Sequence, residues 1–353
     1  YPTVIPVLAN YKEQTCVSPC MLHATTGPCI EAQIKGQFYS PCIESIPPKV
    51  VFFALKDAEM LLQKNYEKPS QCIVCDFYGE IPLFEVINGA RVFECPSCGL
   101  HFTYPMKIMD YEQAYKGEIQ DLLSFSEASS YSCYLNVQEE NLEIERWSQL
   151  PRFNILLPIL SMIPKGKLLD IGCSTGFFML IAKKFGFEVY GMEASEKAVN
   201  IAKEKFKLNV FKALTFDELP EEYKYPYNVI TAFEVLEHVH EPLEFLKDIY
   251  SFLAEDGILI LSCPPFYKFE NTAKGYKKYK WWYNDYPPNH VTRWKPWSLH
   301  YALKKVGFDE VHIFTEPLLP ATVFEGITPK GFNIKLPDEK IINIDVNTVK
   351  III

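Results

Sequence analysis

Residues 167–193 constrain the fold of this 353-residue chain more than any other part of its sequence. An apolar run at 168–171 precedes a turn that contains Gly172 and Gly176, and apolar residues at helical spacing follow that turn. A second apolar run then ends on the acid Glu193. Short apolar strands that alternate with a helix are typical of a parallel sheet buried on both faces. The stretch therefore predicts half of a doubly wound nucleotide-binding unit.

The turn after the first strand discriminates between nucleotide ligands. A dinucleotide fingerprint, G-x-G-x-x-G, has glycine at two positions where this chain has Ser174 and Phe177, so the pattern fails. The remaining pattern is D-x-G-x-x-x-G from Asp170, with Glu193 at the end of the second strand. It suits a ligand that has a ribose but no phosphate, because Glu193 can accept hydrogen bonds from both ribose hydroxyls. S-adenosylmethionine is such a ligand; the alternative is an ordinary parallel-sheet turn with an incidental acid.

Strand-like and helix-like segments keep alternating along the chain, which predicts an α/β fold with a Rossmann-like doubly wound parallel sheet. Strands are expected at 168–171, 189–193, 209–214, 227–233, 257–263 and 311–315. Helices are expected at 177–185, at 195–206 with Ser195 as N-cap, from Pro242 onward, and at 297–306. Two further strand-like runs, 341–346 and 348–353, predict an added hairpin at the end of the chain.

Two Cys-x-x-Cys pairs, Cys72/Cys75 and Cys95/Cys98, flank a predicted hairpin whose turn is Asn88-Gly89. Each pair makes a tight knuckle that directs two thiolates at one point, and two such knuckles complete a tetrahedral zinc site. Because cysteine supplies all four ligands, the site is expected to be structural. The redox alternative requires a thioredoxin-like context, which the surrounding sequence lacks.

The N-terminal residues are harder to interpret. Cys16, Cys20, Cys29 and Cys42 recur at irregular spacing, so they either hold a second metal or cluster or are buried small apolar side chains in a loop-rich extension. Residues 56–66 have helical periodicity. The polar segment 107–150 is expected to be largely helical and to cover the ligand pocket.

Composition excludes several classes of protein. The net charge of -9 argues against broad nonspecific binding of nucleic acid. The sequence contains no apolar run long enough for a transmembrane helix, and its first residues do not resemble a signal peptide. Cysteines in Cys-x-x-Cys pairs favour metal binding in a reducing compartment, so a cytoplasmic location is expected. The sequence does not predict an oligomeric state.

Several motifs together resemble class I S-adenosylmethionine-dependent methyltransferases, the branch that includes ubiquinone-pathway O-methyltransferases. The motifs are LLDIGCSTGFF, VYGMEAS, FEVLEHV, GILILSCPP and HVTRWKPWSLHYALKKVGF, and the resemblance covers residues 150–315. One departure is Ser174, where the family usually has glycine. The resemblance implies that the cofactor is held by one set of residues, Asp170, Gly172, Gly176 and Glu193, with Phe233 near its adenine or methionine end.

The order of motifs also implies a division of the chain. The expected segments are a cysteine-containing extension of unclear fold (1–65), a zinc ribbon (66–106), a helical linker or lid (107–150), the methyltransferase domain (151–316) and a C-terminal extension (317–353). The ribbon resembles that of a subset of methyltransferases with an N-terminal zinc-binding domain, some of which methylate sugars.

Methyl transfer from a sulfonium needs an acceptor held in line and, for a hydroxyl, a base. His238 and His290 are the candidate catalytic residues; the alternative for each is a packed or surface imidazole. The run Glu234-x-x-Glu237-His238 also resembles a divalent-metal site of RNA 3′-end ribose methyltransferases, with His290 as a fourth ligand. The structural alternative places Glu234 at the methionine end of the cofactor and Glu237 at a helix cap.

Residues 266–297 combine many aromatic side chains with an excess of lysine and arginine over acids. Such a segment suits a sugar, a nucleotide-sugar phosphate or unpaired RNA bases, or else it packs its rings as a structural lid. We therefore expect O- or C-methylation of a small molecule, a sugar, a nucleotide sugar or another hydroxylated metabolite, with no membrane partner. An RNA methyltransferase that binds through the ribbon and this segment is the first alternative, and an inactive binding module is the second.

Overall fold

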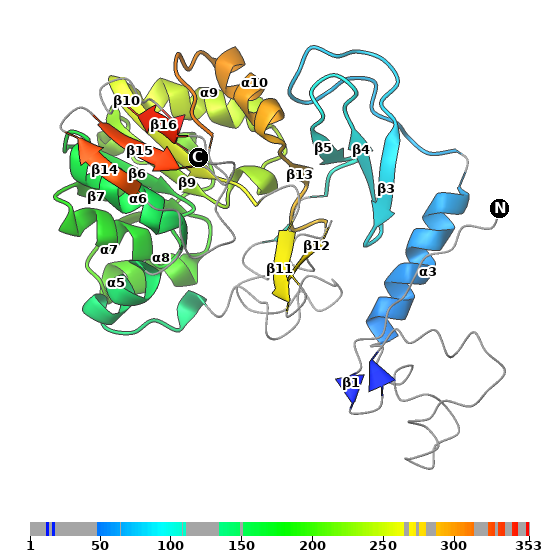
Figure 1. Cartoon of the computed structure of the whole chain (residues 1–353), viewed down its shortest axis with the longest axis horizontal. Coiled ribbons are helices and arrows are strands. Elements are labelled where there is room, and N and C mark those ends of the chain that lie inside the picture. Colours follow the sequence, from blue (N-terminus) through cyan, green and yellow to red (C-terminus); the bar gives the residue numbers. More distant parts are fainter. Residues whose placement is uncertain are drawn as a thin grey trace.

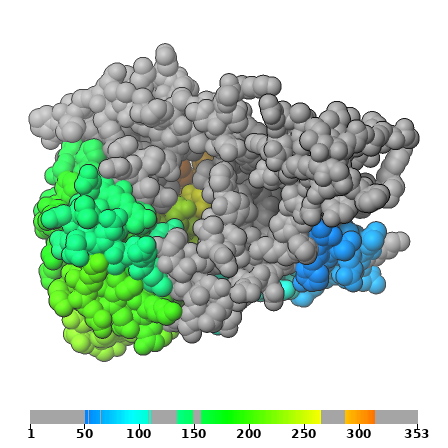
Figure 2. Space-filling view, turned by 90° about the horizontal axis from the view of Figure 1, so that it is seen from below, coloured from blue at the N-terminus to red at the C-terminus, as the bar shows by residue number. Residues whose placement is uncertain are grey.

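The computed structural model describes residues 12–13, 16–17, 48–63, 65–107, 109–110, 134–148, 151–264, 268–272, 275–279, 287–313, 324–328, 331–335, 341–344 and 351–352. It shows an α/β body and a smaller β ribbon, with helix α3 (Pro48–Leu62) beyond the ribbon (Figure 1). The space-filling view places α3, in blue, at the far end from the green α/β body (Figure 2). None of the helices in the described ranges combines the length and apolar composition that a membrane crossing needs.

The α/β body is built on a six-stranded sheet with the order β17-β10-β9-β6-β7-β8, and every neighbouring pair is parallel. The strands are β6 (Lys167–Ile171), β7 (Glu188–Glu193), β8 (Asn209–Lys212), β9 (Tyr227–Phe233), β10 (Leu253–Ser262) and β17 (Ile351–Ile352). The strand order reverses between β6 and β9, and ligands bind at such a switch point beyond the carboxyl ends of the strands. The predicted doubly wound fold is confirmed.

Helices cover the sheet through two apolar cores. They are α5 (Glu140–Ser148), α6 (Pro151–Met162), α7 (Phe177–Lys184), α8 (Glu196–Glu204), α9 (Pro242–Phe252) and α10 (Pro296–Val306). Side chains of α6 and α7, such as Ile159 and Phe178, belong to one core, whereas α9 and α10 contribute Leu246 and Leu299 to the other. Burying the apolar side chains of these helices and strands in the two cores supplies the main driving force for this architecture.

The ribbon consists of β3 (Leu83–Ile87), β4 (Ala90–Glu94) and β5 (His101–Thr103). Asn88 and Gly89 form the β3–β4 turn with φ of 53° and 69°, the left-handed values that a two-residue hairpin loop of this kind requires. The predicted hairpin is therefore confirmed. A fourth strand, β13 (Thr292–Arg293), pairs antiparallel with β5, giving the sheet order β13-β5-β4-β3. This strand comes from the α/β body, and the sequence did not predict the pairing.

Helix α3 differs from the expected helix at 56–66 at both ends. It begins at Pro48, a residue favoured in the first helical turn, and ends at Leu62. Tyr66 lies outside the helix because its ring packs in the ribbon, 6.4 Å from the ring of Phe93 and 4.3 Å from the guanidinium of Arg91. Tertiary contact therefore overrides the helical periodicity at that end.

The expected C-terminal hairpin is wrong. Strand β16 (Ile341–Ile344) pairs with β15 (Gly331–Lys335), which also pairs with β14 (Phe324–Thr328), whereas β17 joins the main sheet beside β10. Both runs form strands, but an apolar, β-branched run does not specify its partner. For the strand expected at 311–315, the described part, 311–313, forms no strand, and the rest lies outside the described residues.

Other expectations fall largely outside the described residues. Cys16 lies in the short strand β2 (Cys16–Val17), paired with β1 (Lys12–Glu13), and the other three N-terminal cysteines are not described. Within the aromatic and basic segment, β11 (Lys268–Thr272) and β12 (Gly275–Tyr279) form an antiparallel hairpin. In the linker, residues 111–133 are not described, and α5 is the helix seen in its described part.

Candidate cofactor and metal sites

The turn between β6 and α7 needs glycine for two separate reasons. Gly172 and Gly176 have φ of 66° and 86°, values that residues with a side chain rarely adopt. A Cβ at Gly172 would lie 2.7 Å from Cγ2 of Val235, and one at Gly176 would lie 2.4 Å from Cδ1 of Leu208. The turn is therefore packed closely against neighbouring side chains at the switch point of the sheet.

Glu193 ends β7 beside this turn and is buried. Its Oε2 accepts a hydrogen bond from the backbone N–H of Ser174 at 2.9 Å, and its Oε1 accepts one from the N–H of Ser195 at 2.8 Å. Ser174, with φ of 50°, directs its N–H at the carboxylate. Because a carboxylate oxygen can accept more than one hydrogen bond, this fixed group suits the recognition of vicinal hydroxyls.

Asp170 lies in β6 and is buried almost completely. The hydroxyl of Thr231 in β9 donates a 2.6 Å hydrogen bond to its Oδ1. Burial raises the pKa of Asp170 to about 7, and the nearby Glu193 carboxylate adds to the rise. A cationic ligand in the crevice would favour the ionised form. Sequence reasoning missed Thr231, which had no signal beyond its place in an apolar strand.

Aromatic side chains lie next to the turn. Phe233, at the end of β9, contacts Phe178 edge to face with ring centroids 4.7 Å apart. The Trp147 ring of α5 stacks on Phe177 at 4.2 Å, and the hydroxyl of Thr175 donates to the carbonyl of Tyr134 at 3.5 Å. The described end of the linker therefore lies against the turn. Sequence reasoning did not single out Trp147, although a lone tryptophan in a polar helix was a usable signal.

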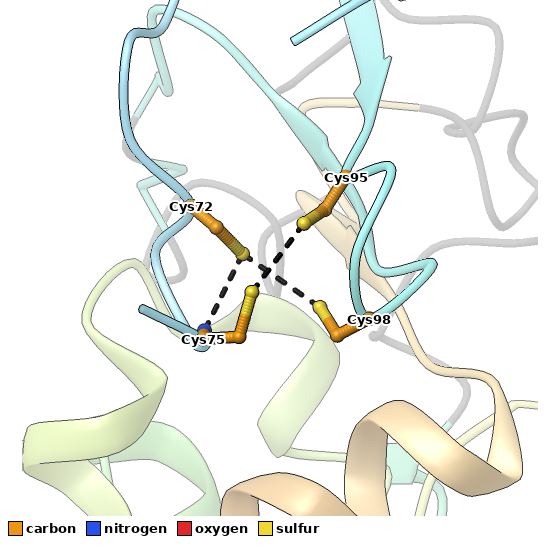
Figure 3. Close-up of side chains that lie close together, drawn as sticks. All are labelled: Cys72, Cys75, Cys95 and Cys98. Carbon is orange, nitrogen blue, oxygen red and sulfur yellow. Dashed lines mark hydrogen bonds between the residues drawn. The ribbon is translucent and has the colours of Figure 1, made fainter. Parts of the chain in front are cut away.

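The four ribbon cysteines converge on one point (Figure 3). Sγ of Cys72 lies 3.7 Å from Sγ of Cys98, Sγ of Cys75 lies 3.5 Å from Sγ of Cys95, and all four sulfur atoms lie within 4.8 Å of one another. A tetrahedral zinc with Zn–S bonds of about 2.3 Å would separate its sulfurs by about 3.8 Å, so the arrangement fits zinc. The same distances exclude disulfides, whose S–S length is about 2.05 Å.

The knuckles also stabilise thiolates. The N–H groups of Val74 and Cys75 point at Sγ of Cys72, at 3.4 and 3.5 Å. A hydrogen bond from the Cys98 thiol, together with these groups, lowers the pKa of Cys72 to about 5, whereas burial raises the pKa of Cys95 to about 11. Four buried thiols therefore cannot all ionise without a cation between them.

A second group of possible metal ligands lies beyond the carboxyl end of β9. Glu237 and His238 are in the short 3-10 helix η5 (Leu236–His238), and His290 precedes β13. Oε1 of Glu237 lies 3.7 Å from Nε2 of His238 and 3.8 Å from Nε2 of His290. The fold thus brings together the two histidines that the sequence singled out. One carboxylate and two imidazoles form a donor set suited to a divalent transition metal.

The tautomer of His238 follows from its contacts. Its Nδ1 lies 2.5 Å from the carbonyl oxygen of Asn289, and a carbonyl can only accept. Nδ1 therefore carries a proton, and in the neutral imidazole the lone pair belongs to Nε2, the atom that faces Glu237. Holding the far nitrogen in this way is how proteins orient a histidine that binds a metal or accepts a proton.

Glu234 is not part of this group of three. Its Oε1 accepts a 3.0 Å hydrogen bond from the hydroxyl of Ser262, and its φ is 56°. Of the four expected ligands, Glu237, His238 and His290 therefore lie together, and Glu234 does not join them. The alternative role of Glu237 as a helix cap is wrong, because Glu241 is the N-cap of α9 and Glu237 is buried against the histidines.

Part of the chain is similar to known methyltransferases. Residues 144–313 match the family model of a methyltransferase domain. The matched region includes the turn, Glu193 and the group of Glu237, His238 and His290. This region of the chain is therefore similar to a methyltransferase domain, and its parallel sheet and strand order agree with the Rossmann-like fold predicted from the sequence.

Individual relatives cover parts of the chain. It is 34% identical over 101 residues to a ubiquinone biosynthesis O-methyltransferase from Caulobacter sp. (strain K31), covering 27% of this chain and 40% of that protein. It is 29% identical over 123 residues to a tRNA U34 carboxymethyltransferase from Campylobacter jejuni (strain ATCC 700819), covering 33% and 41%. The chain thus spans about two fifths of the length of these relatives.

A solved structure of an S-adenosylmethionine-dependent methyltransferase from Mesorhizobium loti matches at a TM-score of 0.37 and 18% identity, over 47% of this chain and 84% of that one. A plantazolicin methyltransferase solved in complex with SAH matches at a TM-score of 0.31 and 18% identity, over 42% and 55%.

Proposed function

We propose that the protein transfers the methyl group of S-adenosylmethionine to a hydroxylated small molecule, of which a sugar or nucleotide sugar is the best candidate. The observation that carries the proposal is the Glu193 carboxylate, which the N–H groups of Ser174 and Ser195 hold beside the glycine turn. A fixed acid at this switch point binds a ribose diol, and the turn offers no cradle for a pyrophosphate.

The cofactor would occupy the crevice from Glu193 to Phe233. Glu193 accepts from the ribose, and the backbone of Gly172 and Gly176 allows the methionine portion to approach closely. Asp170, with its pKa near 7, lies behind the turn and gains negative charge when the cationic cofactor binds. Phe233 supplies an apolar contact beside the ring of Phe178.

His238 and His290 would form the acceptor side. In line transfer from a sulfonium requires a nucleophilic oxygen at contact distance, so the protein must orient a hydroxyl and remove its proton. His290 Nε2 is placed to take this proton, and Glu237 at 3.8 Å stabilises the resulting imidazolium. The relatives named as ubiquinone biosynthesis O-methyltransferases support transfer to oxygen.

The same three residues, Glu237, His238 and His290, fit a divalent cation. Such an ion, when bound, would lower the pKa of an acceptor hydroxyl and orient a diol. In that case the imidazoles act as ligands, and His290 is no longer the direct base. The two versions make opposite predictions for chelation.

We further propose one structural zinc at Cys72, Cys75, Cys95 and Cys98, supported by the convergence of the four sulfur atoms (Figure 3). A site with four thiolate ligands has no open position for catalysis. It also needs a reducing compartment to keep the thiols available, which supports a cytoplasmic location.

RNA is the second candidate acceptor. It is favoured by the likeness to a tRNA U34 carboxymethyltransferase and by the basic residues of 266–297. The net charge of -9 opposes it, because binding to a phosphate backbone depends on released counterions and basic surface. A small-molecule acceptor is therefore preferred.

The deciding experiment supplies S-adenosylmethionine with a labelled methyl group and a panel of sugars, nucleotide sugars, aromatic diols and RNAs. Label in a sugar or diol hydroxyl is expected, and Glu193→Ala should abolish it at low cofactor concentration. Label in RNA would overturn the acceptor class, and failure to bind the cofactor in calorimetry would overturn the activity. Mild chelation that spares the zinc, followed by addition of Mg2+ or Mn2+, then separates the two acceptor-side mechanisms. Turnover that chelation leaves unchanged would identify His290 as the direct base.

A further inference from the structure

We infer that the ribbon, residues 66–106, is a positioning element for His290: it holds the segment 287–293 from one side while η5 holds it from the other. The catalytic consequence rests on the proposed function, whereas the mechanical coupling does not. Figure 1 shows β13 lying between the α/β body and the ribbon strands.

The first contact is strand pairing. β13 and β5 pair antiparallel with Thr292 opposite Phe102 and Arg293 opposite His101. The N–H of Thr103 donates to the carbonyl of Val291 at 2.9 Å, and the Thr103 hydroxyl reaches the same oxygen at 3.4 Å. The residue that follows His290 is thus bonded directly to the ribbon.

The second contact is made by the hairpin turn. The side-chain amide of Asn88 donates to the carbonyl of Pro287, three residues before His290. The turn is itself anchored, because the Asp57 carboxylate of α3 accepts from the N–H groups of Asn88 at 3.0 Å and Gly89 at 2.6 Å. The ribbon therefore holds the segment at both ends, and His290 lies between.

The opposite side of the segment is held by the α/β body. The N–H of Val291 donates to the carbonyl of Glu237 at 2.9 Å, and the hydroxyl of Thr292 reaches the carbonyl of Leu236 at 3.4 Å. His290 is thereby placed against Glu237 and His238. Because a two-residue strand cannot hold its own position, this placement needs both partners.

The ribbon is in turn oriented by its cysteine knuckles and by α10. The N–H of Cys95 bonds the carbonyl of Leu100 at 2.9 Å, so the second knuckle leads directly into β5. Lys305 of α10 donates to the carbonyl of Val74 at 3.2 Å and to the Asp76 carboxylate at 2.7 Å, beside the first knuckle. A zinc at the knuckles would thus stiffen the strand that supports His290.

The test variant is Asn88→Gly in the full chain. Glycine keeps the left-handed turn and both N–H bonds to Asp57, and it removes only the side-chain bond to Pro287. The matched control is Glu80→Gln, which changes an exposed ribbon residue paired with Lys68. A second variant, Cys95→Ser, disturbs the proposed zinc site.

Two readouts do not need the acceptor. Amide hydrogen exchange should quicken about tenfold at 287–294 in Asn88→Gly, as expected for one lost buried hydrogen bond, with no change at 168–176. The imidazole NMR signal of His290, assigned with His290→Gln, should shift or broaden, while that of exposed His300 stays. The affinity for S-adenosylmethionine should remain within about twofold of the parent.

Parent-like exchange at 287–294 and an unmoved His290 signal in Asn88→Gly would overturn the inference. An equal quickening at 168–176 would also overturn it, because that result means general loosening rather than local support. If the parent binds no S-adenosylmethionine, the proposed function fails, yet the exchange and NMR comparison still decides whether the ribbon positions His290.

Discussion

At the scale of single residues, two buried carboxylates mark the site that we propose for the cofactor. Asp170 and Glu193 lie in neighbouring parallel strands, and each is held by a hydrogen bond from another part of the chain. They differ in partner: a hydroxyl donates to Asp170, whereas two backbone N–H groups donate to Glu193. Backbone donors favour the charged form, and burial opposes it. Glu193 therefore suits ligand binding and Asp170 suits a charge that depends on the ligand.

Glu193→Ala should weaken S-adenosylmethionine binding about 100-fold, since hydrogen bonds from two ribose hydroxyls to a charged group are lost. It should also lower the melting temperature, because the N–H groups of Ser174 and Ser195 lose their acceptor. Calorimetric titration and thermal denaturation measure the two effects. Glu196→Ala, which removes an exposed acid of α8, is the charge-matched control. Equal affinities of the Glu193 variant and the parent would contradict the assignment.

Asp170→Asn should raise the free energy of unfolding of the ligand-free protein relative to the parent, and this difference should grow as the pH rises. Burial raises the pKa of Asp170 from its ordinary value of 3.8 to about 7 in the folded state, so the native parent retains a proton that the unfolded chain loses. The contribution of this proton to the parent's free energy of unfolding is fully present below about pH 4. It decreases by on the order of 4 kcal/mol as the pH rises to about 7.

Asparagine mimics the protonated acid and can still accept from Thr231. Denaturant unfolding of both proteins at pH 5 and pH 8 gives the comparison. A stability difference that is the same at both pH values would contradict the raised pKa.

At the scale of elements, the four-stranded ribbon sheet combines strands that are far apart in sequence, β3 to β5 and β13. One cysteine knuckle precedes β3 and the other lies between β4 and β5, whereas the fourth strand, β13, comes from the α/β body. A three-stranded sheet with a small core is marginal by itself, so a metal and a docking surface both contribute to its stability. That surface is provided by Lys305 of α10 and by its N-cap residue Lys295, which donates to Glu94 at 2.6 Å.

The purified protein should contain one zinc at the ribbon, and Cys95→Ser should lose it. Three cysteines with one weaker ligand no longer provide a closed thiolate site. Elemental analysis of freshly purified, unchelated protein measures this, with Cys263→Ser as the control because Cys263 lies outside the group. Less than about half an equivalent of zinc in the parent would refute the site. A second metal that disappears in Glu237→Gln would belong to the acceptor side.

At the scale of the whole molecule, the shared four-stranded sheet means that the ribbon and the α/β body are not independent. Apolar residues of the ribbon, including Phe93 and Phe102, belong to the same core as Leu246 and Leu299 of the helices on that face of the main sheet. Units that share a core and a sheet unfold together. Zinc bound to the ribbon and cofactor bound to the α/β body should therefore stabilise the same unfolding transition.

Calorimetric unfolding of the zinc-loaded protein should show one transition for the ribbon and the body. Removing zinc should lower its midpoint, and adding S-adenosylmethionine at 100 times its Kd should stabilise the same transition by about 2.7 kcal/mol. S-adenosylmethionine given to the Glu193→Ala variant is the control for ligand effects. A separate ribbon transition that moves with zinc alone would show that the two units are uncoupled.

Local sequence patterns determined much of the α/β body. The bounds predicted for β9 and the start predicted for α9 are those observed, and Ser195 caps α8 by accepting from the N–H of Ala198. The Asn88-Gly89 turn and the two cysteine knuckles also follow from residues that are close in sequence. These features could be predicted because backbone conformation and burial on one face depend on neighbouring side chains.

The tertiary structure alone decided which segments became partners. The pairing of β13 with β5, the pairing of β17 with β10, and the bond between Thr231 and Asp170 each join residues distant in sequence. The meeting of His290 with Glu237 is of the same kind. Strand-forming residues predict that a segment pairs in a sheet, but they do not predict which strand it pairs with. That choice depends on how the packed layers place the backbone edges. The sequence by itself therefore determined the chemistry of the candidate site, and the packing of the ribbon against the sheet decided its geometry.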